Sequence, residues 1–161
     1  MSVQISEVAR SRKKIQMWVT VMMGRQHRRY RACADQRLAH LGVSSTLGWP
    51  LIMIGRHPVG IRHGKLSKEL GIESPSLLRP VNQLINNGLV VREEDPTDKR
   101  AKILRLTEAG RDNSLRIEAL LHELRDELFA DLSDNELERF ARFMECMGKR
   151  LDVHLSSLLT R

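Results

Sequence analysis

The stretch from residue 71 to residue 110 constrains the fold more than any other part of this 161-residue chain. We expect a short helix at 65–70 that stops at Gly71, and a second helix at 74–87, where apolar residues recur at helical spacing. The side chains expected on the buried stripe of this second helix are Leu77, Val81, Leu84 and Ile85. Two short helices joined by a glycine turn are therefore predicted.

A β-hairpin is predicted directly after these helices. Residues 89–92 form a short β-branched segment, residues 94–99 form a turn around Pro96, and residues 101–106 alternate as a return strand. A helix with a polar, arginine-bearing face followed by such a hairpin is the order of a winged helix-turn-helix. The predicted fold class is mainly α with a small β-hairpin wing, flanked by N- and C-terminal helices.

Helices are predicted on the N-terminal side of this stretch. No proline and a single glycine interrupt residues 15–41, which predicts one long helix ended by Gly42. A short apolar helix follows at 46–56, with Pro50 expected in its first turn, and a short edge strand is expected at 60–63.

Two more helices are predicted on the C-terminal side. Thr107 is suited to cap a helix over 108–130, and the sequence from Ser133 to Glu136 matches a capping box that opens the last helix. That helix carries an apolar seam at heptad spacing, sustained for three heptads. The residues expected to serve dimerisation are Leu137, Phe140, Met144, Met147, Leu151 and Leu158. The seam indicates packing against another long helix, which is either a second copy of the chain or the chain's own first helix.

The predicted organisation has three parts. Residues 1–45 form an N-terminal arm and a long dimerisation helix, residues 46–106 form the winged helix-turn-helix, and residues 107–161 form C-terminal dimerisation helices.

The charge of the chain is concentrated near its N-terminus. The net charge is +7, and residues 1–34 alone hold eight Lys or Arg and one acid. Residues 62–105 carry nine basic and six acidic side chains, whereas residues 106–161 carry eight and twelve. A basic arm and a basic middle suit a polyanion such as nucleic acid, although a basic segment is also compatible with an ordinary solvated helix face.

Several classes of protein lack support in the sequence. No apolar run has the length of a membrane span, no signal peptide is recognised, and two cysteines do not make a disulfide framework, so a cytoplasmic, nucleoid-associated protein is expected. The six histidines are scattered, so we expect no metal site and no cofactor. No catalytic constellation is present, and no enzyme is expected. Cys33 is interpreted as a buried, inert residue, with an oxidant sensor as the alternative.

The outer face of the 74–87 helix is polar rather than rich in charge. A helix of about 12 residues fits the major groove of DNA, where an arginine fork pairs with guanine and amide side chains pair with adenine. The DNA-contacting candidates on this face are Ser74, Ser76, Arg79, Asn82 and Gln83. A merely solvated helix surface would show the same polarity.

The hairpin adds a second group of candidates. Lys99 and Arg100 lie at or just after the predicted tip, within reach of the minor groove or of flanking phosphates. Asp98 is expected to hold Arg100 through an ion pair and to brace the turn; the alternative is an exposed pair with no role.

Three segments together resemble one known family. DPTDKRAKILRLTEAG resembles the D-P-x-D-R-R-x-x-x-x-L-x-L-T-x-x-G wing signature of the MarR (multiple-antibiotic-resistance regulator) family. GIESPSLLRPVNQLINNGLVVR resembles the recognition-helix segment of its SlyA-like branch, and YRACADQRLAHLGVSSTLGW resembles the junction between the first two helices of that branch. The resemblance covers residues 23–112 well and the remainder by architecture only.

The resemblance implies a transcriptional regulator that binds double-stranded DNA as a homodimer. Each copy would read half of a pseudo-palindromic operator, and the terminal helices would intertwine. By the match, Ser76 and Arg79 fall on DNA-contacting positions, while Asp98 and Arg100 fall on the acid and the minor-groove arginine of the wing. Lys99 replaces a frequent arginine, which keeps the charge but loses the planar fork.

The resemblance also implies release of DNA by a small aromatic or anionic effector. The corresponding lining consists of His27, Tyr30, Arg31, Trp49 and Met53. Ordinary core packing is the alternative role for these residues.

Pro80 departs from a regular recognition helix. Its missing N–H removes a bond to the carbonyl of Ser76, and the residue before a proline is disfavoured in helical conformation. The sequence therefore predicts a kink or an irregular first turn, which affects the aim of Arg79.

Two alternative functions remain open from the sequence. A winged helix can serve as a protein-interaction module, with the seam at 137–158 as its working surface. It can also bind DNA without sequence preference, which the basic arm at 10–31 would suit.

Overall fold

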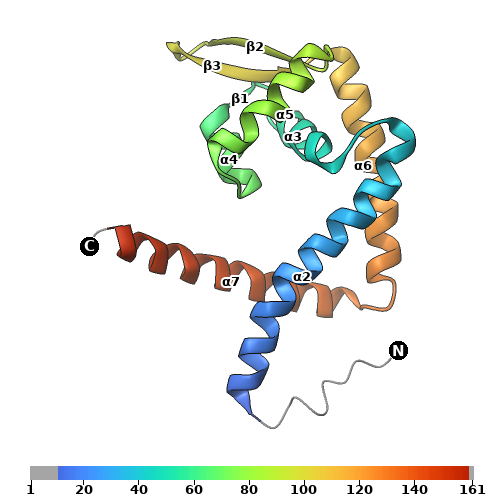
Figure 1. Cartoon of the computed structure of the whole chain (residues 1–161), viewed down its shortest axis with the longest axis vertical. Coiled ribbons are helices and arrows are strands. Elements are labelled where there is room, and N and C mark those ends of the chain that lie inside the picture. The colour runs from blue at the N-terminus through green and yellow to red at the C-terminus, as the bar shows by residue number, and fades with distance from the viewer. Residues whose placement is uncertain (1–10, 160–161) are drawn as a thin grey trace. The chain divides into compact units, whose positions relative to one another are not determined.

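The computed structural model describes residues 11–159, with side chains up to residue 158. Residues 1–10 of the predicted N-terminal arm lie outside the described residues. In chain order the elements are α2 (Arg12–Leu38), the 3-10 turn η1 (Ala39–Leu41), α3 (Ser45–Gly55), β1 (Ile61–Arg62), α4 (His63–Leu70), α5 (Ser74–Asn86), β2 (Val90–Asp95), β3 (Asp98–Leu106), α6 (Glu108–Phe129) and α7 (Asp134–Leu159) (Figure 1). The predicted fold class, mainly α with a small antiparallel wing, is confirmed.

The chain divides into two compact units, residues 1–124 and 125–161. The first part of α6 belongs to the first unit because Ile117, Leu121 and Leu124 are buried in its core. We call residues 45–106, from α3 to β3, the winged-helix lobe.

The sheet of the lobe has the strand order β1-β3-β2, and both pairings are antiparallel. β1 is the edge strand predicted at 60–63, where Ile61 pairs with Leu104. β2 and β3 form the hairpin, which projects from the lobe beside α4 and α5 (Figure 1). Its turn takes only residues 96 and 97, shorter than the predicted 94–99, because Asp95 pairs with Asp98 across an irregularity next to Glu94.

Gly71 makes the turn of the helix-turn-helix. It ends α4 with φ of 65°, in the left-handed region where a glycine has no steric penalty. The amide of Ile72 donates to the carbonyl of Ser67 at 3.1 Å, and the amide of Gly71 donates to that of Lys68 at 3.1 Å. These bonds satisfy the last carbonyls of α4 and direct the chain into α5.

Thr107 and Gly110 join the hairpin to α6. The Thr107 hydroxyl donates to the carbonyl of Gly88 at 2.7 Å and accepts from the amide of Gly110 at 2.9 Å, so it caps α6 as predicted. A Cβ atom at Gly110 would lie 1.9 Å from the carbonyl oxygen of Leu89. The T-x-x-G ending of the wing signature therefore has a packing reason: the start of α6 lies directly against the chain that leaves α5.

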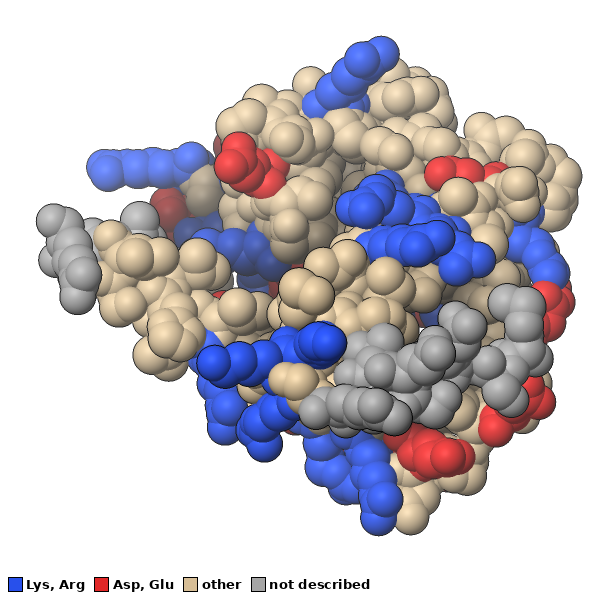
Figure 2. Space-filling view, turned by 60° about the horizontal axis from the view of Figure 1, so that its bottom comes forward, with Lys and Arg blue, Asp and Glu red and all other residues tan. Residues whose placement is uncertain are grey.

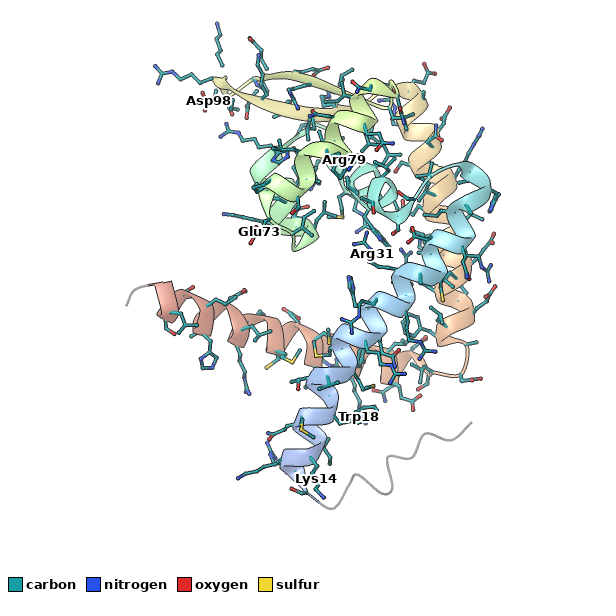
Figure 3. All side chains as sticks on the ribbon, viewed as in Figure 1. Lys14, Trp18, Arg31, Glu73, Arg79 and Asp98 are labelled. Atoms are coloured by element: carbon teal, nitrogen blue, oxygen red, sulfur yellow. The ribbon has the colours of Figure 1, made fainter. Side chains whose placement is uncertain are left out.

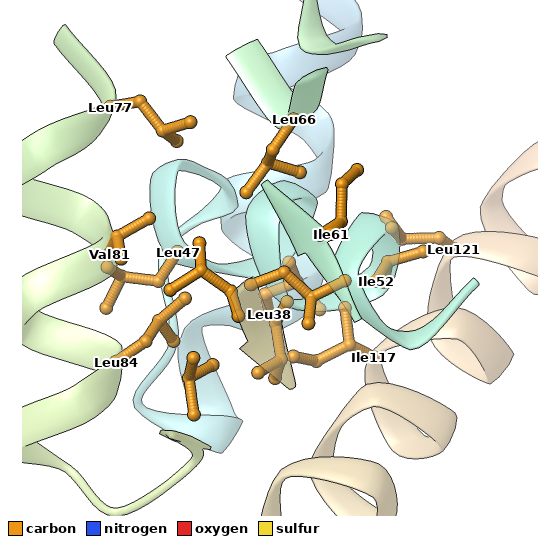
Figure 4. Close-up of a cluster of buried hydrophobic side chains, with 14 of the residues drawn as sticks. Leu38, Leu47, Ile52, Ile61, Leu66, Leu77, Val81, Leu84, Ile117 and Leu121 are labelled. Carbon is orange, nitrogen blue, oxygen red and sulfur yellow. The ribbon is translucent and has the colours of Figure 1, made fainter. Parts of the chain in front are cut away.

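The core of the first unit gathers side chains from five helices and from the sheet (Figure 4). Its large, fully buried members are Leu38, Leu51, Ile52, Ile54, Ile61, Leu66, Leu77, Val81, Leu84, Leu104, Ile117 and Leu121. Burial of each such side chain contributes about 1.5–3 kcal/mol. This packing is what holds α5 against α3 and α4 and fixes its outer face.

The two helices before the sheet depart in detail from the prediction. The long helix ends at Leu38 and tightens into η1 before Gly42, which is left-handed as expected. Pro50 is the sixth residue of α3 rather than part of its first turn, and it is buried. Cys33 is exposed, which corrects its interpretation as a buried residue.

The capping box at the start of α7 is formed as predicted. The carboxylate of Glu136 accepts from the amide and the hydroxyl of Ser133, at 2.9 and 2.6 Å. These two hydrogen bonds lower the pKa of Glu136. α7 therefore has a defined first turn even though none of its residues up to 158 is fully buried.

Across residues 11–159, no single helix is long and apolar enough to cross a membrane. The pair Arg12–Leu41 and Ser45–Gly55, bent by 85°, meets the criteria of length and composition when taken together.

Candidate nucleic-acid interface

α5 turns a polar face away from the core. Ser76, Arg79, Asn82 and Gln83 are exposed on it, whereas Leu77, Val81 and Leu84 are buried on the opposite side. Figure 3 labels Arg79 on this helix. In the part of the chain that the structure describes, the guanidinium of Arg79 has no ion-pair or hydrogen-bond partner.

Ser74, one of the predicted DNA-contacting residues, is not the N-cap of α5. The helix begins at Ser74 itself, the residue before it is Glu73, and Pro75 occupies the second position. The Ser74 hydroxyl instead forms a 2.8 Å hydrogen bond with the hydroxyl of Ser67 in α4. Ser74 therefore links the two helices of the motif, and this contact uses one of the hydrogen bonds that its hydroxyl offers.

Pro80 is accommodated within α5. The helix runs unbroken from Ser74 to Asn86, and the Pro80 ring is buried together with Leu77 and Val81. Burial of the ring offsets part of the roughly 3 kcal/mol that an interior proline costs. Proline is therefore part of the core face, and Arg79 remains on the exposed face beside it.

Arg92 is a member of this surface that the sequence did not single out. It lies on β2, and its Nη2 donates to Oδ1 of Asn82 at 3.2 Å. The contact joins the hairpin to the outer face of α5. Together with burial, the charge of Arg92 lowers the pKa of His63, at the start of α4.

The base of the wing turn is held by Asp95 and Arg62, which sequence reasoning also missed. Asp95 is 7% exposed, and its Oδ2 accepts from Nε of Arg62, on β1, at 2.6 Å. Its Oδ1 accepts from the amide and the hydroxyl of Thr97, at 2.8 and 2.6 Å. Asp95 therefore closes the turn and fastens the hairpin to the edge strand.

The hydrogen bonds around Asp95 change its acidity. Its pKa is lowered to about 2, first by the Thr97 hydroxyl and amide and then by Arg62, against the opposing effect of burial. The group is therefore a carboxylate throughout the physiological range. An aspartate that accepts from the residue two positions later is a recognised turn device, so Asp95 carried a local signal. Arg62 carried none, because its role depends on the pairing of β1 with β3.

Asp98 contacts Arg62 rather than the side chain of Arg100. Its Oδ2 lies 3.7 Å from Nη2 of Arg62, and its Oδ1 accepts from the backbone amide of Arg100 at 3.1 Å. The predicted ion pair between Asp98 and Arg100 is therefore wrong, because the adjacent strand supplies the cation. The brace on the turn is retained, and Figure 3 shows Asp98 near the tip of the hairpin.

The tip is the part of the hairpin with uncompensated positive charge. Further along the strands, Lys102 pairs with Glu94 at 3.0 Å and Arg105 pairs with Glu93 at 3.3 Å. Lys99 and Arg100 are exposed, and within the described residues neither side chain has an ion-pair partner. The tip is therefore suited to an anionic surface, whereas the flanking strands are close to neutral.

Basic side chains also gather outside the lobe. On the face drawn in Figure 2, Lys and Arg groups dominate the charged surface. α2 contributes Arg25, Arg28 and Arg29, which are all exposed.

The residues predicted to line an effector site lie around the contact between α2 and α3. The rings of Tyr30 and Trp49 are 6.0 Å apart between centroids, and Nη2 of Arg31 donates to the hydroxyl of Ser45 at 3.3 Å. Tyr30, Arg31, Trp49 and Met53 are half-buried, whereas His27 is exposed. The structure thus brings Tyr30 and Trp49 together but places His27 at the surface.

The residues predicted for dimerisation follow one side of α7. Phe140, Met144, Leu151 and Leu158 are exposed, whereas Leu137 and Met147 are half-buried. Among residues 11–158, no group of three His, Cys, Asp or Glu side chains is placed to hold a metal ion.

A polar helix face beside a hairpin with a cationic tip is typical of winged helix-turn-helix proteins that bind nucleic acid. The model of the MarR family matches residues 51–101, from the middle of α3 to the hairpin. Over these residues the chain is similar to this family of transcriptional regulators.

Solved structures of transcriptional regulators are similar to the chain as well. Transcriptional regulator PA3341 is 27% identical to the chain, with a TM-score of 0.78 over 83% of this chain and 98% of that chain. Transcriptional regulator SlyA is 20% identical, with a TM-score of 0.75 over 83% of this chain and 93% of SlyA. CouR from Rhodococcus jostii RHA1, whose structure was solved bound to p-coumaroyl-CoA, is 19% identical, with a TM-score of 0.75 over 80% and 90%. The last two likenesses support the fold.

Proposed function

We propose that this chain regulates transcription by binding a pseudo-palindromic operator as a homodimer. The observation that carries the proposal is the outer face of α5, where Ser76, Arg79, Asn82 and Gln83 are exposed and Arg79 has no intrachain partner in the described residues. α5 enters the major groove, and its arginine and amides read base edges.

The wing binds beside the recognition helix. Lys99 and Arg100 at its tip contact the minor groove or the adjacent phosphates, and Asp98 acts on DNA only by bracing the turn. Ser74 contributes through its bond to Ser67, which ties the two helices of the motif together. Phosphate contacts of this kind make the affinity fall steeply with salt.

Dimerisation uses the terminal helices. α7 carries an apolar side with the exposed residues Phe140, Leu151 and Leu158, which a second copy of the chain would cover. Two lobes related by a dyad would then meet half-sites about one helical turn, or 10 bp, apart. The protein acts where the operator is, on the nucleoid, and represses by occupying it.

Genomic SELEX with the purified full chain, repeated at two salt concentrations, tests this function. Enrichment of a short inverted repeat is the expected result. Binding that is sensitive to salt but enriches no motif would favour an architectural DNA-binding protein, and no binding at all would favour a protein-interaction module.

A small effector is part of the proposal. The Tyr30–Trp49 ring pair beside Arg31 supports an aromatic or anionic ligand, and CouR is a protein of this fold that binds p-coumaroyl-CoA. Benzoate and p-coumaroyl-CoA are suitable probes, with release of fluorescently labelled operator followed by anisotropy. Arg31→Gln should raise the concentration of probe needed for release without changing operator affinity. Release of the operator at the same probe concentration by the wild-type protein and by Arg31→Gln would show that Arg31 does not bind the effector.

A further inference from the structure

Leu78 is an exposed apolar residue on the outer, mostly polar side of α5. Its side chain is 50% exposed, whereas the other large apolar side chains of the helix are buried or half-buried. An isobutyl group left in water contributes little to the stability of the lobe. Its position on the helix expected to face DNA suggests that it is buried when DNA binds.

The neighbour of Leu78 on this side of α5 is Asn82. Residues four apart lie one above the other on a helix, so the two side chains form one edge of the polar face. Arg79 lies on the same face, next to Leu78 in sequence. The edge thus combines an apolar group with an amide.

Arg92 sets the orientation of that amide. A guanidinium group can only donate hydrogen bonds, so the 3.2 Å contact from Nη2 requires the oxygen of Asn82 to point toward β2. The NH2 group of Asn82 is then directed away from Arg92 as a donor. Leu78 and Asn82 therefore offer an apolar surface and a hydrogen-bond donor side by side.

Thymine is the base that matches this pair of groups. In the major groove it presents the C5 methyl group next to the O4 acceptor, whereas guanine offers acceptors without a methyl group and cytosine offers a donor. Resting on the proposed operator binding, we infer that the Leu78–Asn82 edge of α5 reads a thymine. Leu78 packs on the methyl group, the NH2 of Asn82 donates to O4, and Arg92 is the positioning residue for Asn82.

The methyl contact is tested with two versions of the operator recovered by SELEX, one containing thymine and one with every thymine replaced by deoxyuridine. Loss of one buried methyl group should weaken binding about 4-fold for one half-site and about 15-fold for two. Leu78→Ala should reduce this discrimination toward 1-fold. Leu115→Ala, at an exposed leucine of α6, is the matched control and should keep it.

The outcomes separate this inference from the proposed function. No binding of wild-type protein to either operator would overturn both. Tight, sequence-specific binding with equal affinity for the two operators would overturn the thymine contact and leave the proposed function intact. Discrimination that survives Leu78→Ala would also overturn the role of Leu78.

A double-mutant cycle tests the positioning role of Arg92. Binding of Asn82→Ala, Arg92→Ala and the double variant is measured on the operator and on versions in which each T·A pair of a half-site is replaced in turn by C·G. If Arg92 orients Asn82, each single variant lowers the preference for T·A and the double variant lowers it no further. A uniform loss of affinity on all of these operators, additive with Asn82→Ala, would make Arg92 a simple phosphate contact and overturn this part of the inference.

Discussion

The first unit and α7 use their apolar residues in different ways. Every described side chain that is fully buried belongs to the unit that ends at Leu124, and α7 has none. α7 nevertheless carries Phe140, Leu151 and Leu158 at more than half exposure. The first unit builds a core of its own, although α2 exposes Met17 and Val21. α7 has no such core and is an amphipathic helix whose apolar side is suited to another chain.

The two regions also differ in how their polar groups are arranged. In the lobe, cross-strand pairs and the bonds around Asp95 neutralise most charges of the hairpin. Among the described residues, Lys99 and Arg100 at its tip have no ion-pair partner. In α7, the described ion pairs join neighbouring turns of the same helix, as between Glu145 and Lys149. The lobe is therefore organised to present selected groups to a ligand, and α7 is organised as a stable helix.

The largest expected difference between the first unit and α7 is in the effect of replacing a leucine by alanine. Leu121→Ala, in the core of the first unit, should lower the free energy of unfolding by about 2–5 kcal/mol, because it leaves a cavity. Leu151→Ala, on α7, should change the unfolding of the first unit little but weaken self-association by about 1 kcal/mol or more. Urea denaturation and sedimentation equilibrium measure the two effects, and equal effects of both variants on unfolding would contradict the division.

The glycines Gly110 and Gly148 give a second matched pair. Gly110→Ala forces a Cβ atom against the carbonyl of Leu89, so we expect a loss of about 3 kcal/mol in the free energy of unfolding. Gly148→Ala meets no atom within 4 Å and should stabilise α7 by about 0.5–1 kcal/mol. Thermal denaturation of both variants provides the comparison, and a stable Gly110→Ala protein would refute the close approach.

Arg79→Ala should weaken operator binding by about 1–3 kcal/mol and relax one base preference. Arg116→Ala removes an exposed arginine from α6 and is the control for a change in net charge. Fluorescence anisotropy on operator and on random DNA distinguishes base reading by Arg79 from a general effect of net charge. Equal losses on both DNAs would count against base reading by Arg79.

Acid titration should reveal the carboxylate of Asp95. Because its folded-state pKa of about 2 lies below the ordinary value of about 4, its contribution to stability is complete above about pH 4 and is lost as the pH falls through about 2. Asp95→Asn should therefore be less stable than wild type at neutral pH, and the difference should narrow between pH 4 and pH 2. A difference that stays constant over this range would contradict the low pKa; Asp112→Asn, at an exposed acid of α6, is the control.

Local sequence signals predicted the scaffold well. The periodicity of α5, the cap at Thr107, the capping box at Ser133 and the glycine stop at Gly71 all appear in the structure, because each depends on residues within one turn of one another. The family resemblance predicted the class of protein for a related reason, since the wing signature encodes the turn and the T-x-x-G junction.

The contacts that support the candidate interface were harder to predict. Arg62 bonds Asp95 across 33 positions of sequence, and Arg92 reaches Asn82 from another element. Such pairs exist only once the strand register and the packing of α5 against β2 are set. The same reason explains why Asp98 pairs with Arg62 rather than with its neighbour Arg100.

The proposed function requires that each lobe binds one half-site while the terminal helices pair two copies of the chain. The number of protomers bound to one DNA duplex is the direct test of this requirement. Native mass spectrometry would compare the full chain on a duplex with the complete inverted repeat and on a duplex with one half-site. We expect two protomers on the complete site, with one lobe on each half, and much weaker binding to the half-site alone. A single protomer bound to either duplex with the same affinity would contradict the proposal.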